Sequence, residues 1–533
     1  MKTREQTNVV QLVIDFGIDL NLQYEIDFSD DDIFGSDDAA YENFSVLQSY
    51  SVERTSCKEY LNEKKEFMVL CAPKGTGKTT LVRLWQYKLS LKRNYVSIIK
   101  FDAQISPDLK SNSLSTWIRA WKRNIVYAIY LTLTNNKHYG VKPEDLKFIE
   151  TVERRGVNKQ NLIELIIEHI PKSKLLGVRE IENKKSMKIW VFLDEIDQYF
   201  RKTEQDILKI ASMLIACREM TSYISNVNIR TTIKPNVWAI LRAQVSSMAN
   251  LRELVIKYKW DSEGIKAIIA KRVESYIRRK YYSGSYHSIL GYNYLPRDMD
   301  WLINQLFDPE KDFDLSKKKN ENRSKQVVPP HKTLSTLGNY RPRWVLAMCK
   351  GASREALKRK NSKISIEHIY SHLPDFGKER IKDLASEYRT QCDSIVRIIN
   401  SFYKGNSNFS NMQYLIDRIN ENIISKFDVC IEGVSEQCNA KQILEFLFEI
   451  GFVQPKNWVS KQRFNFIAFE DNPILLEGDV NNKSIYDDLI WEIHPSFRNI
   501  LSLDRTPHNK IFRNSTSNFH GKQKIKQTKY RSK

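Results

Sequence analysis

The stretch Ala72-Pro-Lys-Gly-Thr-Gly-Lys-Thr79 decides the fold. It follows the apolar run Phe67–Ala72 and precedes a helical pattern that extends to about Leu89. Glycines lack a Cβ, so a glycine-rich loop can wrap phosphate oxygens tightly with backbone N–H groups. The helix that follows directs the positive end of its dipole at the same anion. This strand–loop–helix predicts a nucleotide phosphate site formed by Ala72, Pro73, Lys74, Gly75, Thr76, Gly77, Lys78, Thr79 and Thr80.

Two side chains of the loop have expected roles. Lys78 would reach the β and γ phosphates, and Thr79 would offer its hydroxyl to Mg²⁺. The pattern GxxxxGK[ST] begins with Gly, and this chain has the small residue Ala72 there. The alternative, a chance Gly/Lys turn, is disfavoured by the strand before the loop and the helix after it.

A second motif, Asp194-Glu195-Ile196-Asp197, ends the apolar run Lys188–Leu193. An acid at the carboxyl end of a strand beside the phosphate loop can hold Mg²⁺ through water, a role expected of Asp194. Glu195 is then placed to orient or deprotonate the attacking water. Without the apolar strand before it, a pair of carboxylates in a loop would indicate a solvated turn or a helix cap. For Asp197 the alternative stays open that it caps the next helix.

Further short apolar runs alternate with helical patterns along the same part of the chain. The runs are Tyr95–Phe101, Lys188–Leu193, Val227–Ile233 and a short Leu254–Ile256. Helical patterns cover Ser115–Leu133, about Lys159–Ile170 and Glu204–Thr221. Strands that are apolar on both faces and separated by helices indicate a parallel sheet covered on both sides. The expected fold class is therefore α/β.

At these residues the chain resembles the AAA+ branch of P-loop ATPases, specifically the origin-recognition and initiator clade. It also resembles the related bacterial STAND-like ATPases, several of which belong to phage-defence systems. The residues that carry the resemblance are APKGTGKT, FLDEID and Gly338-Asn-Tyr-Arg-Pro-Arg343 with WVLAMCKGASREA after it. The resemblance implies ATP and Mg²⁺ as cofactors, a homo-oligomer, and Arg343 as the sensor-two arginine of a lid, with Arg341 as the alternate. Lys234 or Asn236 would serve as sensor one, and no arginine finger is assigned.

The expected organisation has five parts. They are an acidic segment 1–43, a P-loop ATPase core 44–258, a helical lid 259–375 with an exposed insertion 308–331, a winged-helix-like α+β domain 376–504 and a basic disordered tail 505–533. One long helix is expected to contain Ile381, Tyr388, Cys392 and Ile399. The winged-helix-like part would either insert a helix into DNA or dock on protein.

Composition narrows the class of protein. The 533 residues include 84 Lys plus Arg and 64 Asp plus Glu, a net charge of +20, which favours nucleic acid, expected to be DNA, as a partner. Ten acidic residues and no basic residue lie from Asp15 to Phe44. Nine basic residues and no acidic residue lie from Arg505 to Lys533. Each run is either a solvated tail or a contact surface, the acidic one shielding a basic surface or docking on a partner. With no membrane-length apolar stretch and no CxxC pair, a cytoplasmic, reduced protein without a zinc site is expected.

One other pattern has open alternatives. Trp117, Arg119, Trp121, Lys122 and Arg123 interleave aromatic and basic side chains, which suits either a Trp-anchored core helix or a nucleic-acid contact.

The sequence therefore predicts a Mg²⁺-dependent ATPase that works as a conformational switch, acts on or senses DNA, and uses a partner protein for any effector step. A role in antiphage defence follows from the resemblance alone. The alternative is a DNA-binding or scaffold protein that holds ATP without turning it over.

Overall fold

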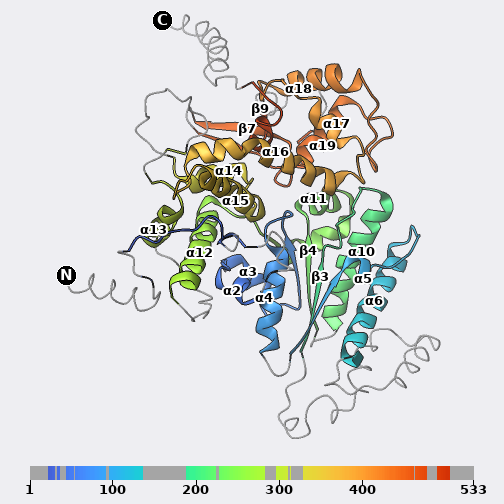
Figure 1. Cartoon of the computed structure of the whole chain (residues 1–533). Helices are drawn as coiled ribbons and strands as arrows, with labels where there is room; N and C mark the ends of the chain where they lie inside the picture. The colour runs from blue at the N-terminus through green and yellow to red at the C-terminus, as the bar shows by residue number, and fades with distance from the viewer. Residues whose placement is uncertain are drawn as a thin grey trace, which may run out of the picture. The chain divides into compact units, whose positions relative to one another are not determined.

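The computed structural model (Figure 1) describes residues 18, 22–30, 33–35, 42, 44–52, 54–91, 95–135, 188–223, 227–282, 296–309, 312–313, 328–460, 463–473, 475–476 and 489–504. The chain divides into two compact units, Met1–His372 and Leu373–Lys533. The expected helix at 159–170, most of the insertion 308–331 and the tail 505–533 lie outside the described residues. The finer five-part division stays a prediction.

A five-stranded parallel sheet forms the centre of the first unit. Its strands are β1 (Phe67–Cys71), β2 (Tyr95–Phe101), β3 (Lys188–Asp194), β4 (Val227–Ile233) and β5 (Val255–Lys257), in the order β2-β3-β4-β1-β5. The pairs β1–β4 and β3–β4 are both parallel, so β4 separates the strand of the phosphate loop from the strand of the acidic motif. All three carboxyl ends lie at the same edge of the sheet, where open α/β sheets bind their ligands.

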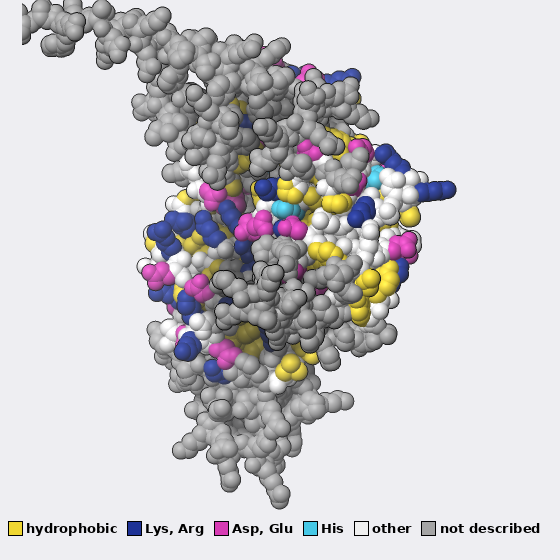
Figure 2. Space-filling model, turned by 90° about the vertical axis from the view of Figure 1, so that its left-hand side faces the viewer, with side chains coloured by type: hydrophobic (Ala, Val, Ile, Leu, Met, Phe, Trp, Pro, Cys, Tyr) yellow, Lys and Arg dark blue, Asp and Glu magenta, His cyan; other side chains and the backbone are white. Residues whose placement is uncertain are grey.

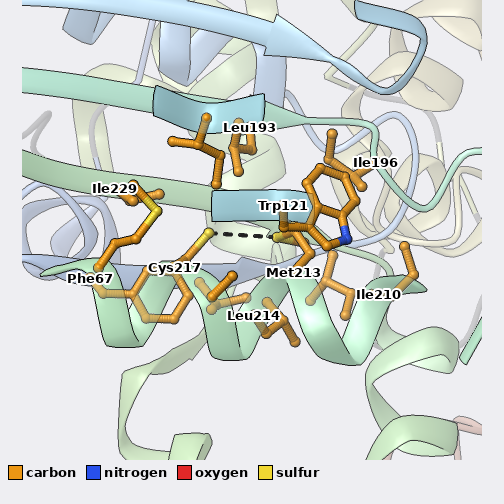
Figure 3. Close-up of a cluster of buried hydrophobic side chains, with 14 of the residues drawn as sticks. Phe67, Trp121, Leu193, Ile196, Ile210, Met213, Leu214, Cys217 and Ile229 are labelled. Atoms are coloured by element: carbon orange, nitrogen blue, oxygen red, sulfur yellow. Dashed lines mark hydrogen bonds between the residues drawn. The ribbon is translucent and has the colours of Figure 1, made fainter. Parts of the chain in front are cut away.

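Helices cover both faces of this sheet, because alternate side chains of its strands are apolar on both sides. Ile189, Val191 and Leu193 pack with α6 (Leu114–Asn135) and α10 (Glu204–Tyr223) in one cluster. Figure 3 shows Ile210, Met213, Leu214 and Cys217 of α10 beneath the strands, with Trp121 beside them. Trp190 and Phe192 pack on the opposite face against Val82 and Leu89 of α4 (Lys78–Ser90). The expected α/β fold class is confirmed.

Shorter elements complete this part of the first unit. They are α2 (Phe44–Ser49), α3 (Thr55–Tyr60), α5 (Asp102–Ile105), α11 (Pro235–Gln244) and the 3₁₀ helix η3 (Ser246–Leu254). Trp117 and Trp121 of α6 are 3% and 0% exposed and belong to the main core cluster. The interpretation of α6 as a Trp-anchored core helix is therefore confirmed.

A helical lid follows β5. It consists of α12 (Ser262–Tyr281), α13 (Pro296–Leu306), α14 (Pro330–Leu337), α15 (Pro342–Lys358) and the first part of α16 (Ile366–Tyr388). Asp261 caps α12, because its Oδ1 accepts the amide of Gly264 at 2.7 Å. This is the cap that the sequence predicts.

The described residues of the acidic N-terminal segment pack on the lid. We call residues 22–30 and 33–35 the N-terminal strap. Its apolar side chains Tyr24, Ile26, Phe28, Ile33 and Phe34 are buried. The amide of Asp27 donates to the hydroxyl of Tyr276 at 3.0 Å, and its carboxylate lies 3.7 Å from the Lys280 ammonium. In its described residues this acidic run is therefore a contact surface and not a solvated tail, and its shielding of a basic surface stays a prediction.

The second unit contains an antiparallel sheet of order β6-β9-β7-β8. Its strands are β6 (Asn408–Phe409), β7 (Val453–Ser460), β8 (Arg463–Phe466) and β9 (Ile490–Ile493), and its helices after α16 are α17 (Ile395–Asn400), α18 (Met412–Ile419), η4 (Asn420–Ile424), α19 (Ala440–Glu449) and α20 (Pro495–Arg498). The succession helix, strand, two helices and hairpin is winged-helix-like, as expected.

One prediction for this unit is wrong. The long helix expected across Ile381–Ile399 is two helices, because α16 ends at Tyr388 and α17 begins at Ile395. The chain turns between them, where the amides of Gln391 and Cys392 both bond to the carbonyl of Tyr388. Across the described ranges, no helix combines the length and apolarity needed to cross a membrane.

Candidate nucleotide site

The glycine-rich loop between β1 and α4 is shaped as a phosphate cradle. Gly75 and Gly77 have φ of +80° and +91°, the left-handed region that side chains with a Cβ rarely adopt. The amide of Ala72 is used by the sheet, where it donates to the carbonyl of Ile233 at 2.9 Å. Among the described residues, no partner accepts from the amides of Gly75, Thr76, Gly77, Lys78 or Thr79. These donors therefore remain available to an anion at the start of α4.

Side chains of the loop hold it in shape without a ligand. Thr76 Oγ1 donates to the carbonyl of Pro73 at 2.8 Å. Lys78 Nζ donates to the carbonyls of Ala72 at 2.8 Å and Pro73 at 3.4 Å. The ammonium group thus lies over the mouth of the loop, within reach of an oxygen bound there. Lys74 is exposed, and Thr80 is half-buried in the first turn of α4.

The acidic motif meets the phosphate loop through Asp194. This residue is 1% exposed, and its Oδ2 accepts the hydroxyl of Thr79 at 3.0 Å. Its Oδ1 accepts the hydroxyl of Thr232, at the end of β4, at 2.6 Å. The loop and the acidic motif, which are separated in the sheet by β4, are joined by these two hydroxyls.

Glu195 follows in an uncommon backbone conformation. Its φ is 56°, in the left-handed region where non-glycine residues are rare and cluster at functional sites. Its amide donates to Asp194 Oδ1 at 3.1 Å, and its side chain is exposed at the carboxyl edge of the sheet. Desolvation by surrounding protein atoms raises the pKa of Glu195, and the charge of Asp194 adds to it, while Lys78 and Lys74 oppose the rise.

The oxygens of Thr79 and Asp194 fit a magnesium ion. Mg²⁺ prefers hard oxygen ligands and usually keeps several of its waters. Thr79 Oγ1 lies 3.0 Å from Asp194 Oδ2, so a hydroxyl and a carboxylate stand together beside the loop, and an ion on the Thr79 hydroxyl would be held by Asp194 through water. Within the described ranges, no group of three or more His, Cys, Asp or Glu side chains is arranged to hold a metal.

The lid reaches the loop at the start of α15. The amide of Arg343 donates to the carbonyl of Gly75 at 3.2 Å. A Cβ added to Gly75 would lie 3.3 Å from the Cβ of Arg343 and 3.9 Å from that of Arg341. The guanidinium of Arg341 stacks on the ring of Trp344, 4.6 Å from its centroid. Both lid arginines named from the sequence therefore lie beside the loop.

Of the two expected sensor-one residues, Lys234 directly precedes α11 and Asn236 lies in its first turn. The amide of Lys234 donates to Asp197 Oδ2, and its ammonium to the carbonyl of Gln198 at 3.4 Å. Asn236 lies half-buried in the first turn of α11. Asp197 thereby ties the turn after β3 to the start of α11. It does not cap α10, where the amide of Asp206 bonds to the hydroxyl of Thr203.

Sequence reasoning missed two residues at this site. Thr232 contacts Asp194 and accepts from the amide of Glu195 at 3.4 Å. Because β4 reads VNIRTTI, Thr232 is one of several polar residues in the strand, and the sequence does not single it out. Trp260, between β5 and α12, donates its indole N–H to the carbonyl of Thr76 at 2.9 Å. Nothing in the sequence pattern indicates that contact.

Comparisons with known proteins give structural similarities alone, since no family model and no curated protein sequence matches the chain. The structure is similar to the Aeropyrum pernix ORC2 protein in ADPNP–ADP complexes (12% identity, 92% of this chain, 99% of that chain, TM-score 0.39). It is similar to Cdc6p from Pyrobaculum aerophilum (12%, 91% and 98%, 0.29) and to Drosophila ORC bound to DNA (10%, 93% and 98%, 0.27). The functional argument rests on the residues of this chain.

Proposed function

We propose that the protein binds ATP with Mg²⁺ and hydrolyses it as a conformational switch. The observation that carries the proposal is the contact of Asp194 with Thr79, which joins an acidic motif to a loop with unused backbone donors. A loop that bound another anion would have no need of a buried carboxylate against its threonine.

Each residue of the nucleotide site has its own proposed role. The amides of the loop and the ammonium of Lys78 bind the phosphate oxygens, and Thr79 and Asp194 would hold Mg²⁺. Bound there, the ion would neutralise charge on the phosphates. Glu195 accepts a proton from the attacking water, a task that a raised pKa suits. The hydroxyl of Thr232 bonds both Asp194 and the amide of Glu195 and so fixes the positions of these two residues.

The lid converts nucleotide state into movement. Because Arg343 lies against Gly75, its guanidinium can reach a phosphate bound in the loop and change the position of α15 with the state of that phosphate. Sensor-one function of Lys234 or Asn236 stays a prediction. The same holds for the homo-oligomer, the partner protein, the cytoplasmic location and antiphage defence.

Nucleic acid, expected to be DNA, is the proposed object of the switch. The support is the net charge of +20 on the whole chain. On the face displayed in Figure 2, basic side chains lie close to acidic ones, so the charge does not form a single uniform area there. The binding surface therefore has to be identified from particular residues.

A scaffold that holds ATP without turnover is the second candidate. It would need the loop and the lid but not a carboxylate beyond Asp194. The placement of Glu195 at the edge of the sheet, in a left-handed conformation, favours the switch.

The test is steady-state ATP hydrolysis by the full chain with and without duplex DNA. Glu195→Gln should lower turnover by at least about 100-fold and leave ATP affinity nearly unchanged. Arg343→Ala should lower turnover while preserving the loop, and Lys78→Ala should weaken ATP binding. Arg359→Ala, at the far end of α15, serves as the matched control for Arg343. Equal, near-zero turnover in wild type and Glu195→Gln would establish the scaffold instead.

A further inference from the structure

The helix of the second unit that was expected to insert into DNA lacks the side chains that such a contact needs. In a winged helix the helix before the hairpin enters the major groove. Here that helix is α19, and Ile443, Leu444, Phe446, Leu447 and Phe448 are buried. Its half-buried polar positions are Lys441, Gln442 and Glu445, and Gln442 is used in a capping box with Asn439. One lysine and one glutamate offer no net attraction for phosphate.

A different surface of the same unit carries exposed aromatic rings with cations. Tyr403 and Tyr414 are 51% and 60% exposed, more than any other large hydrophobic side chain in the described part of this unit. The Lys404 ammonium lies 5.4 Å from the centroid of the Tyr403 ring. Arg418 is one helical turn after Tyr414 on α18. We call these four residues the tyrosine–cation surface.

The helix α18 meets the turn between α17 and β6 at Arg418. A Cβ added to Gly405 would lie 2.9 Å from the NH2 nitrogen of Arg418, so the guanidinium lies against the turn that holds Tyr403 and Lys404. Lys404 has φ of 55°, a left-handed conformation that is rare for lysine. One carboxylate, Asp417, lies on the same helix and accepts from Gln413 at 2.8 Å.

The end of the described chain is bonded to the same turn. The amide of Lys404 donates to the carbonyl of Leu501, and the amide of Asp504 donates to the carbonyl of Gly405, each at 2.9 Å. Residues 505–533, with nine bases and no acid, follow directly in the sequence. The described chain therefore ends at this turn, and the nine bases follow it in the sequence.

We propose that the tyrosine–cation surface binds single-stranded nucleic acid. Exposed tyrosine rings stack on unpaired bases, whereas the bases of a duplex are already stacked on one another. Lys404 and Arg418 would contact the phosphates between the stacked bases. This inference names the partner of the proposed switch and rests on it to that extent, although the binding itself requires no ATP hydrolysis.

The test is fluorescence anisotropy of a labelled oligo(dT) of about 20 nucleotides with the full chain. Tyr403→Ala and Tyr414→Ala should each weaken binding by about tenfold, whereas Tyr403→Phe and Tyr414→Phe keep the ring and should remain within about twofold. Phe466→Ala is the matched control, because Phe466 is 39% exposed on β8, the edge strand opposite β6. Unfolding midpoints equal to wild type would show that the alanine variants are folded.

The contribution of the Lys404 charge is tested separately, from the dependence of oligo(dT) binding on salt concentration. Lys404→Ala should reduce the slope of log K against log salt concentration by about 0.7 if the lysine contacts one phosphate of a single strand. Tighter binding of a duplex than of oligo(dT), equal loss in the Phe variants, or loss confined to Phe466→Ala would each overturn the proposal. ATP hydrolysis without nucleic acid should be unchanged in the Tyr variants. A wild type without turnover that still binds oligo(dT) would reject the switch and retain this surface.

Discussion

The indole N–H of Trp260 donates to the carbonyl oxygen of Thr76 at 2.9 Å. Trp260 lies between β5 and α12, so it joins the phosphate loop to the connection between the sheet and the lid. Arg54 stacks on its ring, 4.8 Å from the centroid, and donates to the carbonyl of Lys259. A change in loop shape on nucleotide binding would therefore act on the start of α12 as well as on α15.

Trp260→Phe keeps the aromatic ring and removes this hydrogen bond. A neutral hydrogen bond contributes about 0.5–1.5 kcal/mol, so ATP affinity should fall by about two- to twelvefold. Titration of the variant with ATP measures the effect. Trp301→Phe on α13 is the control, and ATP affinity equal to wild type in Trp260→Phe would show that the contact does not support the loop.

The raised pKa of Glu195 makes turnover dependent on pH. A general base acts in its deprotonated form, so kcat should decline as pH falls through the pKa of Glu195, which lies above its usual 4.5. Lys74 lowers this pKa by its charge, so Lys74→Ala should move the decline to higher pH. The measurement is kcat across about pH 5–9 for both proteins. A decline at lower pH in Lys74→Ala would contradict this electrostatic assignment.

The sheet and the loop were predictable because their signals are local. Strand β1 and the residues Ile189–Leu193 of β3 are apolar on both faces and therefore appear as uninterrupted runs, and Gly75 and Gly77 indicate a left-handed loop directly. Asp194 follows from its place at a strand end.

Contacts between distant segments were not predictable. Thr232 reaches Asp194 because β4 pairs with β3, and strand order cannot be read from the runs themselves. The N-terminal strap was obscured by its acids, although Tyr24, Ile26 and Phe28 alternate with polar residues as in a segment with one buried face. The turn between Tyr388 and Ile395 interrupts an apolar pattern that continues with helical spacing, so periodicity alone missed it.

Arg230 is a buried cation whose partners are backbone carbonyls. It lies in β4, is 0% exposed and donates to the carbonyls of Tyr60, Asn62, Lys65, Glu66 and Ile229. Its guanidinium also lies 4.6 Å from the centroid of the Trp190 ring. Burial lowers the pKa of Arg230 to about 10, so it stays charged at neutral pH. It thereby fixes the connection between α3 and β1 just before the phosphate loop.

Arg230→Met should lower the free energy of unfolding by at least about 3 kcal/mol, because several carbonyls lose their donor inside the protein. Urea unfolding at neutral pH measures the change. Arg242→Met, at an exposed position of α11, is the control and should stay within about 0.5 kcal/mol of wild type. Equal unfolding midpoints for the two variants would mean that the connection is held by other contacts.

The N-terminal strap should stabilise the lid through Tyr24. The side chain is 7% exposed, and its ring lies 5.1 Å from Tyr281 and 5.9 Å from Trp301 between centroids. Its amide donates to Gln305 Oε1 at 3.1 Å, so the strap bridges α12 and α13. Tyr24→Ala should cost about 3 kcal/mol, as for other buried aromatic side chains, and should increase hydrogen exchange in α12 and α13. Leu22→Ala, 54% exposed in the same strap, should leave both unchanged. If Tyr24→Ala matched Leu22→Ala in exchange and stability, the acidic segment would be a solvated tail after all.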